Sequence, residues 1–379
     1  RGCAFFGGPP AIVDRSAEEP KLMAHRILVT GGAGFIGSNI IYYLLDSAEA
    51  DLGISIERVV TLDKLTYAGN PENLEGLAGD GRHRLVQGDI CDANLVSALL
   101  KEEQINAVIH LAAESHVDRS IDASSEFIQT NVVGTHTLLN IARQWANMGK
   151  VDFRFLHVST DEVYGSLGAN DPAFSEVSAY APNSPYSASK AGGDHLARAW
   201  FQTYGFPVII TNCSNNYGPR QFPEKLVPLM IQKLRLGKKL PIYGDGSNVR
   251  DWLYVEDHCR ALALALVKGA PGEVYNVGGK CELSNLAMVK TLITAVAEMV
   301  DSVDAQNPEE WIGFVTDRPG HDWRYAVDCS KINRELHWEP KESFESGLKK
   351  TVEWYLANDS WISRIEDGSY RGERLGLGD

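Results

Sequence analysis

The fold is decided by residues 26–37, which read RILVTGGAGFIG. A short apolar run leads directly into Gly31, Gly34 and Gly37, and apolar residues then return at helical spacing. A strand that ends in a glycine turn and opens a helix is typical of a dinucleotide site, because free N–H groups at the helix start attract phosphate. The spacing is G-x-x-G-x-x-G rather than G-x-G-x-x-G, so a glycine turn without a ligand is the alternative.

An acidic residue after the next strand is the second part of this pattern. Glu57–Leu62 is the predicted strand, and Asp63 follows it, roughly 26 residues past Gly37, against the usual ~20. A carboxylate there can bind both ribose hydroxyls and repels a 2′-phosphate, which favours NAD over NADP. The neighbouring Lys64 argues slightly against that preference, and a solvated strand end is the alternative interpretation of Asp63.

Composition places the chain among ordinary soluble globular proteins. Its 379 residues suffice for one large or two moderate domains. No apolar run approaches the ~18 residues needed to cross a bilayer. The net charge of −14 argues against binding to nucleic acid or to an anionic membrane, so an anionic substrate must be met by local Arg and Lys. The six cysteines form no C-x-x-C pair and are expected to be reduced thiols of a cytoplasmic protein.

The first residues do not resemble the start of a fold. Residues 1–22 contain Gly-Gly-Pro-Pro and have no helical period. Their apolar stretch is too short and too broken for a secretory signal. We expect a non-native or disordered leader, with Met23 as the natural start.

Further strands and helices follow in alternation, which predicts an α/β fold with a Rossmann-type, doubly wound parallel sheet. The fourth strand ends in Leu111, Ala112 and Ala113, whose small side chains leave room for a ligand beside the sheet. Asp89 follows the third strand and could reach the adenine amine, or could cap the next helix. The expected strands after the second are Arg84–Gly88, Ala107–Leu111, Phe153–Ser159, Val208–Asn212 and Val274–Val277.

Two adjacent acids follow the fifth strand, in the segment Thr160-Asp161-Glu162. Carboxyl groups at the end of a buried strand are costly unless they are used, and over a cleft they suit paired acid and base chemistry. A helix cap in a solvated turn is the alternative.

Tyr186 and Lys190 stand four residues apart, which places them on one face of a helix. A free tyrosine has a pKa near ~10. A nearby ammonium, together with the nicotinamide charge, favours the phenolate and prepares Tyr186 as a base. The alternative is an amphipathic helix with a chance Tyr and Lys.

Together these segments resemble the extended short-chain dehydrogenase/reductase superfamily, and within it the nucleotide-sugar 4,6-dehydratases. The resemblance covers Arg26 to about Tyr370. It is carried by Thr160-Asp161-Glu162 before Val-Tyr-Gly, by the Tyr186–Lys190 pair, by NCSNNYGP at 212–219 and by DRPGHD at 317–322. Sugar-nucleotide epimerases resemble the same overall pattern but usually have small or apolar residues in place of the two acids. Asp161 and Glu162 therefore distinguish a dehydratase from an epimerase.

The resemblance implies a resident NAD and a nucleotide-sugar substrate, dTDP-glucose or a relative. The implied cofactor contacts are Gly31, Gly34, Phe35, Ile36, Gly37, Asp63, Lys64, Thr66, Asp89, Ile90, Leu111, Ala112, Ala113, Thr130, Tyr186, Lys190 and Asn215. The implied substrate contacts are Ser115, Thr160, Asn215, Glu224, Lys225, Leu226, Pro241, Tyr243, Arg250, Asn285, Asp317, Arg318, His321 and Tyr370. Among these, Arg250 and Arg318 suit the diphosphate, because the guanidinium fork matches phosphate oxygens.

The resemblance also implies roles for the five catalytic residues. Tyr186 takes the proton of the sugar's C4 hydroxyl, Thr160 holds that oxygen, and Lys190 orients the nicotinamide ribose. Glu162 removes the C5 proton, and Asp161 protonates the C6 hydroxyl, which leaves as water. Hydride passes from C4 to NAD and returns to C6, so the cofactor is regenerated in each cycle.

Other expectations concern organisation. Residues 23–213 with 250–277 are predicted to form the NAD-binding domain, and 214–249 with 278–370 the nucleotide-sugar domain. The resemblance implies a homodimer packed through the helix pair that includes Tyr186. Three alternatives stay open: a 4-epimerase, a 4,6-dehydratase of UDP-glucose or GDP-mannose, and a non-catalytic NAD-binding regulator.

Overall fold

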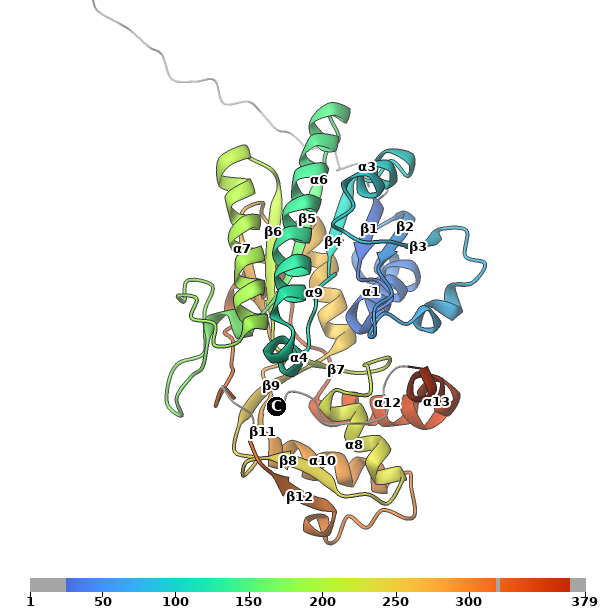
Figure 1. Cartoon of the computed structure of the whole chain (residues 1–379), viewed down its shortest axis with the longest axis vertical. Coiled ribbons are helices and arrows are strands. Elements are labelled where there is room, and N and C mark those ends of the chain that lie inside the picture. Colours follow the sequence, from blue (N-terminus) through green and yellow to red (C-terminus); the bar gives the residue numbers. More distant parts are fainter. Residues whose placement is uncertain (1–24, 318–320, 369–379) are drawn as a thin grey trace, which may run out of the picture.

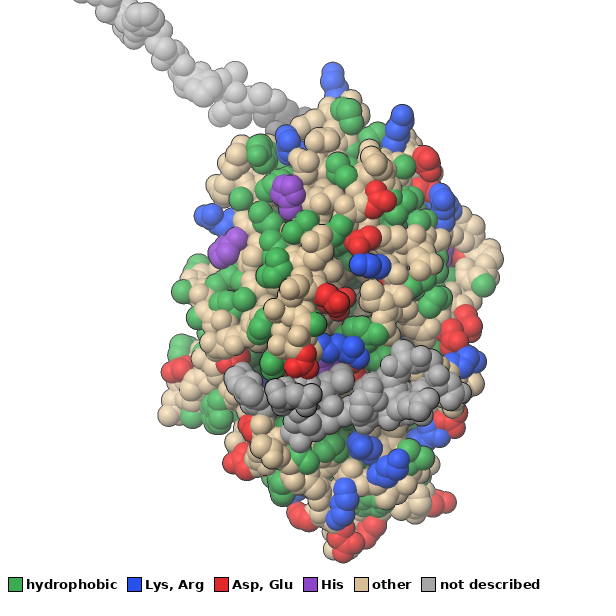
Figure 2. All heavy atoms as spheres, viewed as in Figure 1, with side chains coloured by type: hydrophobic (Ala, Val, Ile, Leu, Met, Phe, Trp, Pro, Cys, Tyr) green, Lys and Arg blue, Asp and Glu red, His purple; other side chains and the backbone are tan. Residues whose placement is uncertain are grey.

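The computed structural model describes residues 25–317 and 321–368 (Figure 1). Predictions for residues 1–22, Met23, Arg318 and Tyr370 lie outside the described residues. No described helix is long and apolar enough to cross a membrane. On the face seen in Figure 2, acidic and basic side chains are interspersed rather than gathered by sign.

A seven-stranded parallel sheet forms the upper part of the molecule in Figure 1, with strand order β10-β6-β5-β4-β1-β2-β3. The expected doubly wound parallel sheet is confirmed, and each predicted strand is present within a few residues of its predicted bounds. The strands are β1 (His25–Thr30), β2 (Ile56–Asp63), β3 (His83–Gln87), β4 (Ala107–His110), β5 (Arg154–Thr160), β6 (Val208–Cys213) and β10 (Val274–Val277).

Strand alternation divides β1 between two hydrophobic clusters, one on each face of the sheet. Ile27 and Val29 belong to one cluster and Leu28 to the other, and all three are fully buried. The first face is covered by α1 (Phe35–Asp46), α2 (Ala48–Leu52), α9 (Val255–Lys268) and α11 (Ser330–Leu336). The second is covered by α3 (Ala93–Glu102), α6 (Thr135–Gly149) and α7 (Pro185–Tyr204).

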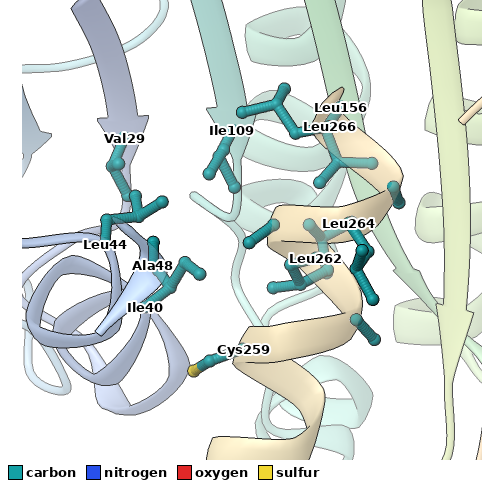
Figure 3. Packing of buried hydrophobic residues seen from close by; sticks show 14 of the residues in the cluster. Val29, Ile40, Leu44, Ala48, Ile109, Leu156, Cys259, Leu262, Leu264 and Leu266 are labelled. Carbon is teal, nitrogen blue, oxygen red and sulfur yellow. The ribbon is translucent and has the colours of Figure 1, made fainter. Parts of the chain in front are cut away.

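The late helix α9 completes the first face. Figure 3 shows Leu262 and Leu266 of α9 beside Ile109 and Leu156 of the central strands, with α1 alongside. A strand buried on both faces in this way needs apolar residues at consecutive positions, as β1 and β4 have.

The helix expected after β4 is continuous but not uniformly wound. It runs as α5 (Ser124–Phe127), a π-helical segment η2 (Ile128–Gly134) and then α6, after the short α4 (Val117–Asp122). A π segment inside an α-helix is uncommon and is frequently found near functional sites.

The lower part of Figure 1 has a separate hydrophobic cluster and two small sheets. One sheet has the order β11-β9-β7 and the other pairs β12 with β8. Its elements are β7 (Asn215–Tyr217), α8 (Leu226–Arg235), β8 (Leu240–Tyr243), β9 (Val249–Tyr254), β11 (Glu282–Ser284), α10 (Asn285–Ala297), η4 (Pro308–Trp311), β12 (Ile312–Val315), α12 (Phe344–Ala357) and α13 (Asp359–Gly368). Two short helical turns, η1 (Pro71–Leu77) and η3 (Asp161–Tyr164), belong instead to the large sheet, where they follow β2 and β5.

Candidate active site

The glycine turn between β1 and α1 has no room for side chains. Gly31 has a φ of +70°, and a Cβ there would lie 2.7 Å from the backbone nitrogen of Ala112. A Cβ on Gly37 would lie 2.1 Å from the carbonyl oxygen of Gly31. The N–H groups of a helix's first turn have no partner within the helix, and the start of α1 lines a cleft. A turn of this kind could hold a pyrophosphate.

Asp63 ties the second strand to that turn. One carboxylate oxygen accepts a hydrogen bond from the Ala33 N–H at 2.9 Å, and the other from the Leu65 N–H at 2.8 Å. Burial raises the pKa of Asp63, and these two backbone hydrogen bonds lower it. Each oxygen keeps a further lone pair, so the carboxylate can still accept from ribose hydroxyls. The solvated-strand-end interpretation is wrong, because Asp63 is buried.

Lys64 and Asp89 form an ion pair at 2.9 Å at the same end of the cleft. The alternative in which Asp89 caps the following helix is wrong, because Asp92 accepts the cap hydrogen bonds from Asn94 and Leu95. Asp89 is therefore left facing the cleft, with its carboxylate paired to Lys64.

The two acids after β5 sit in a short helical turn. The Thr160 hydroxyl accepts from the Glu162 N–H at 3.3 Å and donates to Asp161 Oδ1 at 3.4 Å. Asp161 is 2% exposed, and its Oδ2 has no hydrogen-bond partner among the described residues. Burial, followed by the charge of Glu162, raises the pKa of Asp161 well above its ordinary value. The turn is capped as the alternative interpretation proposed, but Asp161 is buried rather than solvated, and its surroundings favour the protonated form.

Tyr186 and Lys190 are buried on one face of α7, as their spacing predicts. The helix begins with a capping box between Ser184 and Ser187 and with Pro185 at its first position, which fixes its start. Lys190 Nζ donates to the Val158 carbonyl at 2.8 Å.

The predicted lowering of the Tyr186 pKa is wrong for this arrangement of groups. Burial, and then the charge of Glu162, raises the pKa of Tyr186 well above its ordinary value, while a hydrogen bond with Thr160 lowers it. An acid that faces the phenol opposes its ionisation.

One cleft of about 330 Å³ gathers the predicted catalytic and cofactor residues. All five catalytic residues and all the predicted cofactor residues line it, from the glycine turn at one end to Asn215 at the other. Of the predicted substrate residues it also includes Ser115, Glu224 and Lys225. Lys225 Nζ donates to the Ser115 carbonyl at 3.3 Å, which joins the ends of two segments far apart in sequence.

The remaining described substrate candidates lie outside this cleft. Tyr243 and His321 pack edge to face at 6.2 Å, and His321 Nδ1 lies 2.7 Å from Asp317 Oδ1. Pro241 lies in β8, and Leu226 and Asn285 begin α8 and α10.

Arg250, expected at the diphosphate, is buried and donates to the Val249 carbonyl at 2.7 Å and to the Asp322 carbonyl at 2.9 Å. It also lies over the ring of Tyr325 at 4.5 Å. Its charge lowers the pKa of Asp161, so it is close enough to act on the catalytic turn.

Several cleft residues were missed by the sequence analysis. Most adjoin predicted ones, so extending each motif by a residue or two would have found them. Gln221 and Phe222 carried no motif of their own, and only their place just before Glu224 pointed to them. The missed lining residues are Leu62, Ala68, Gly69, Gly88, Glu114, Val158, Ser159, Cys213, Ser214, Asn216, Gln221 and Phe222.

A doubly wound sheet with a glycine turn, an acid at the end of β2, and Tyr186 and Lys190 beside Thr160 defines an extended short-chain dehydrogenase/reductase. A model of the family described as GDP-mannose 4,6 dehydratase matches residues 28–351. The chain belongs to the dTDP-glucose 4,6-dehydratase family within this class.

The relatives that place it there are similar over almost their whole length. The dTDP-glucose 4,6-dehydratase of Neisseria meningitidis serogroup B (strain ATCC BAA-335 / MC58) is 54% identical over 359 residues, covering 93% of this chain and 99% of that protein. The Escherichia coli dTDP-glucose 4,6-dehydratase is 51% identical over 366 residues, covering 93% and 99%.

Solved structures agree with this placement. DesIV, a dTDP-glucose 4,6-dehydratase from Streptomyces venezuelae with NAD and TYD bound, has a TM-score of 0.82 and 48% identity, covering 90% of this chain and 99% of that one. A UDP-glucuronic acid 4-epimerase from Bacillus cereus, in complex with UDP-glucuronic acid and NAD, has a TM-score of 0.76 and 29% identity, covering 88% and 99%.

Proposed function

We propose that this chain catalyses the NAD-dependent dehydration of dTDP-glucose to dTDP-4-keto-6-deoxyglucose. The observation that carries the proposal is the pair Asp161 and Glu162, set in one cleft with Tyr186. Elimination of water needs an acid and a base together, and an epimerase has no use for this pair. The names of the similar proteins support the same substrate.

The residues present fit NAD as the resident cofactor. The crowded turn at Gly31 and Gly37 leaves only backbone to face a pyrophosphate, and Asp63 stands where the adenosine ribose would lie. Lys190 would orient the nicotinamide ribose. Bound NAD would supply the chemistry of a reversible hydride acceptor, taking hydride from C4 and returning it to C6.

The chain's own residues would move the protons. Tyr186 takes the proton of the C4 hydroxyl while Thr160, which is hydrogen-bonded to the phenol, holds the oxygen. Because burial and Glu162 raise the pKa of Tyr186, the phenol depends on the positive charges of Lys190 and the bound nicotinamide to become a base.

Elimination follows from the next two residues. Glu162 removes the C5 proton, which the new 4-ketone makes acidic. Asp161 gives its proton to the C6 hydroxyl, which leaves as water. The raised pKa of Asp161 supports this assignment, because a general acid must hold its proton at the working pH.

The nucleotide sugar would extend from this cleft toward the lower part of the molecule. Ser115, Asn215, Glu224 and Lys225 at the cleft supply its near contacts, and Tyr243, Asp317 and His321 its far ones. We propose the division into an NAD-binding domain (23–213 with 250–277) and a nucleotide-sugar domain (214–249 with 278–370) on the same grounds.

We also propose a cytoplasmic homodimer, packed through α7 and the helix beside it. Apolar side chains on that helix support a covered face, because Ile128 is 50% and Val133 40% exposed in the single chain. Light scattering after size-exclusion chromatography tests the oligomeric state, and a monomer at micromolar concentration would contradict it.

The function is tested by incubating the purified protein with dTDP-glucose in deuterated water without added NAD. We expect loss of water with one deuterium at C5, seen by mass spectrometry and NMR. Glu162→Gln is the matched control and should lose this activity. Recovery of dTDP-galactose without loss of water would make the protein an epimerase, and faster conversion of UDP-glucose or GDP-mannose would change the substrate.

A further inference from the structure

Asp194 is a buried carboxyl group on α7 that the reaction described above does not use. It is 2% exposed. Three side chains contact its two oxygens: His157 Nε2 at 3.0 Å, the Ser159 hydroxyl at 2.9 Å and the Tyr180 hydroxyl at 3.0 Å. A buried carboxylate that accepts from three donors is costly to displace, because each lost hydrogen bond leaves a buried polar group without a partner.

Its place on the helix connects it to the catalytic pair. Tyr186, Lys190 and Asp194 follow one another at intervals of four residues, so they share one face of α7. Lys190 donates to the carbonyl of Val158, and Asp194 binds the side chains of His157 and Ser159. Two residues of α7 therefore hold three consecutive residues of β5.

Thr160 is the last residue of that strand, and Asp161 and Glu162 follow it as the first residues of η3. The only covalent path between Ser159 and the two acids is the Thr160 backbone, so a shift of β5 against α7 would displace the acids relative to Tyr186. Tyr180 fixes the same point from a third side, because its hydroxyl also accepts from Asn212 of the neighbouring strand at 3.3 Å.

Charge adds to this geometry. Lys190 and Asp194 are both buried, and an unpaired buried charge is costly. Burial lowers the pKa of Lys190 and the charge of Asp194 raises it. Asp194 thus partly offsets the effect of burial on the Lys190 ammonium.

We propose that Asp194 is a positioning residue. It holds the elimination pair, Asp161 and Glu162, at a fixed position relative to the oxidation pair, Tyr186 and Lys190. This inference rests on the proposed function. The two pairs lie on different elements, and they must act on adjacent carbons of one sugar before the 4-ketone leaves the site.

The test compares Asp194→Asn with the wild-type protein, both purified with their NAD. Oxidation at C4 is followed in a single turnover by the absorbance of reduced nicotinamide, and water loss by mass spectrometry of the quenched mixture. We expect Asp194→Asn to slow water loss about 10-fold more than oxidation, as a displacement of catalytic groups by a fraction of an ångström would do. Released 4-ketoglucose nucleotide should appear, with KM changed less than about 3-fold.

Asp257→Asn is the matched control. Asp257 is a buried carboxyl on α9 that accepts from the Lys341 and Glu342 N–H groups, both at 2.9 Å, and it does not line the cleft. Its loss should lower Tm without changing the ratio of the two rates. Tyr180→Phe removes one donor and keeps the charge, so it should shift the ratio in the same direction by less, and it carries the test if Asp194→Asn does not fold.

Equal slowing of both steps, or a drop in Tm with an unchanged ratio, would overturn the inference. Failure of the wild type to dehydrate dTDP-glucose would instead overturn the proposed function, so the two failures are distinguishable.

Discussion

Asp63 and Asp161 are two buried carboxyl groups that follow strands of the same sheet, one at the dinucleotide end of the cleft and one at the catalytic end. Burial is the largest cause of a raised pKa in both. Their partners differ. Asp63 accepts two short backbone hydrogen bonds, whereas Asp161 has one long contact with Thr160 and faces a second acid.

The difference separates binding from proton transfer. The two backbone N–H groups favour the charged form of Asp63, which under the proposed function accepts from the hydroxyls of a ligand. Asp161 has no such donors, and burial together with the charge of Glu162 opposes its ionisation, which suits the proton donor of the proposed function. Burial alone does not decide what a carboxyl group does; its donors do.

Replacing Asp161 by Asn should impair catalysis, and it should have the largest effect of the changes considered for these two carboxyl groups. We expect water loss to fall by about 10²–10⁴-fold, the usual contribution of a general acid. Bound NAD, counted after denaturation of the purified protein, should stay near one per chain, because Asp161 does not bind the dinucleotide. Near-wild-type dehydration would show that another group supplies the proton.

Replacing Asp63 by Asn should instead weaken the binding of NAD. An amide turns one acceptor into a donor, which then faces the N–H of Ala33 or Leu65. We expect NAD affinity to fall about 10–100-fold, corresponding to hydrogen bonds of about 1.5–3 kcal/mol to a charged group. With saturating NAD, kcat should recover to within about 3-fold. A large loss of kcat at saturation would contradict a purely binding role.

The two carboxyl groups should also differ in how they make the stability of the protein depend on pH, and this effect should be the smallest of the three. The pKa of Asp161 is higher in the folded than in the unfolded chain, so the stability that it contributes at low pH is lost as pH rises from about 4 toward its folded pKa. An asparagine side chain does not ionise, so the variant does not lose stability in this way as pH rises. The Tm of Asp161→Asn relative to the wild type should therefore rise with pH, by about 1 °C for each 1 kcal/mol of stability that the wild type loses, as calorimetry would measure. Asp63→Asn should show the same sign with a smaller slope, because the two amide bonds offset burial.

The parts of this protein that the sequence predicted well are local. The glycine turn, the acid after β2 and the Tyr186–Lys190 spacing each depend on a few consecutive residues, and the apolar strands reveal a sheet buried on both faces. The roles of the site residues remain predictions. The division into two domains likewise remains a prediction.

What could not be predicted depends on contacts between distant segments. Asp194 meets Ser159 across 35 positions, and Arg250 meets the Asp322 carbonyl across 72. The direction of the Tyr186 pKa shift depends on burial of the phenol and on the charge of Glu162, neither of which the sequence shows. Whether Asp89 caps the next helix could be decided only from the structure, in which Asp92 accepts the cap hydrogen bonds and Asp89 pairs with Lys64.

The place of α9 has a consequence for how the chain is made. Val29, Ile109 and Leu156 are synthesised early, but the helix that covers them with Leu262 and Leu266 comes from residues 255–268 (Figure 3). A nascent chain on the ribosome therefore presents one apolar sheet face while the excursion through β7, α8, β8 and β9 is being translated. An exposed apolar face of this kind makes a nascent chain prone to aggregate or to be bound by chaperones. Complete burial of the earliest strands to leave the ribosome thus requires a helix from much later in the chain.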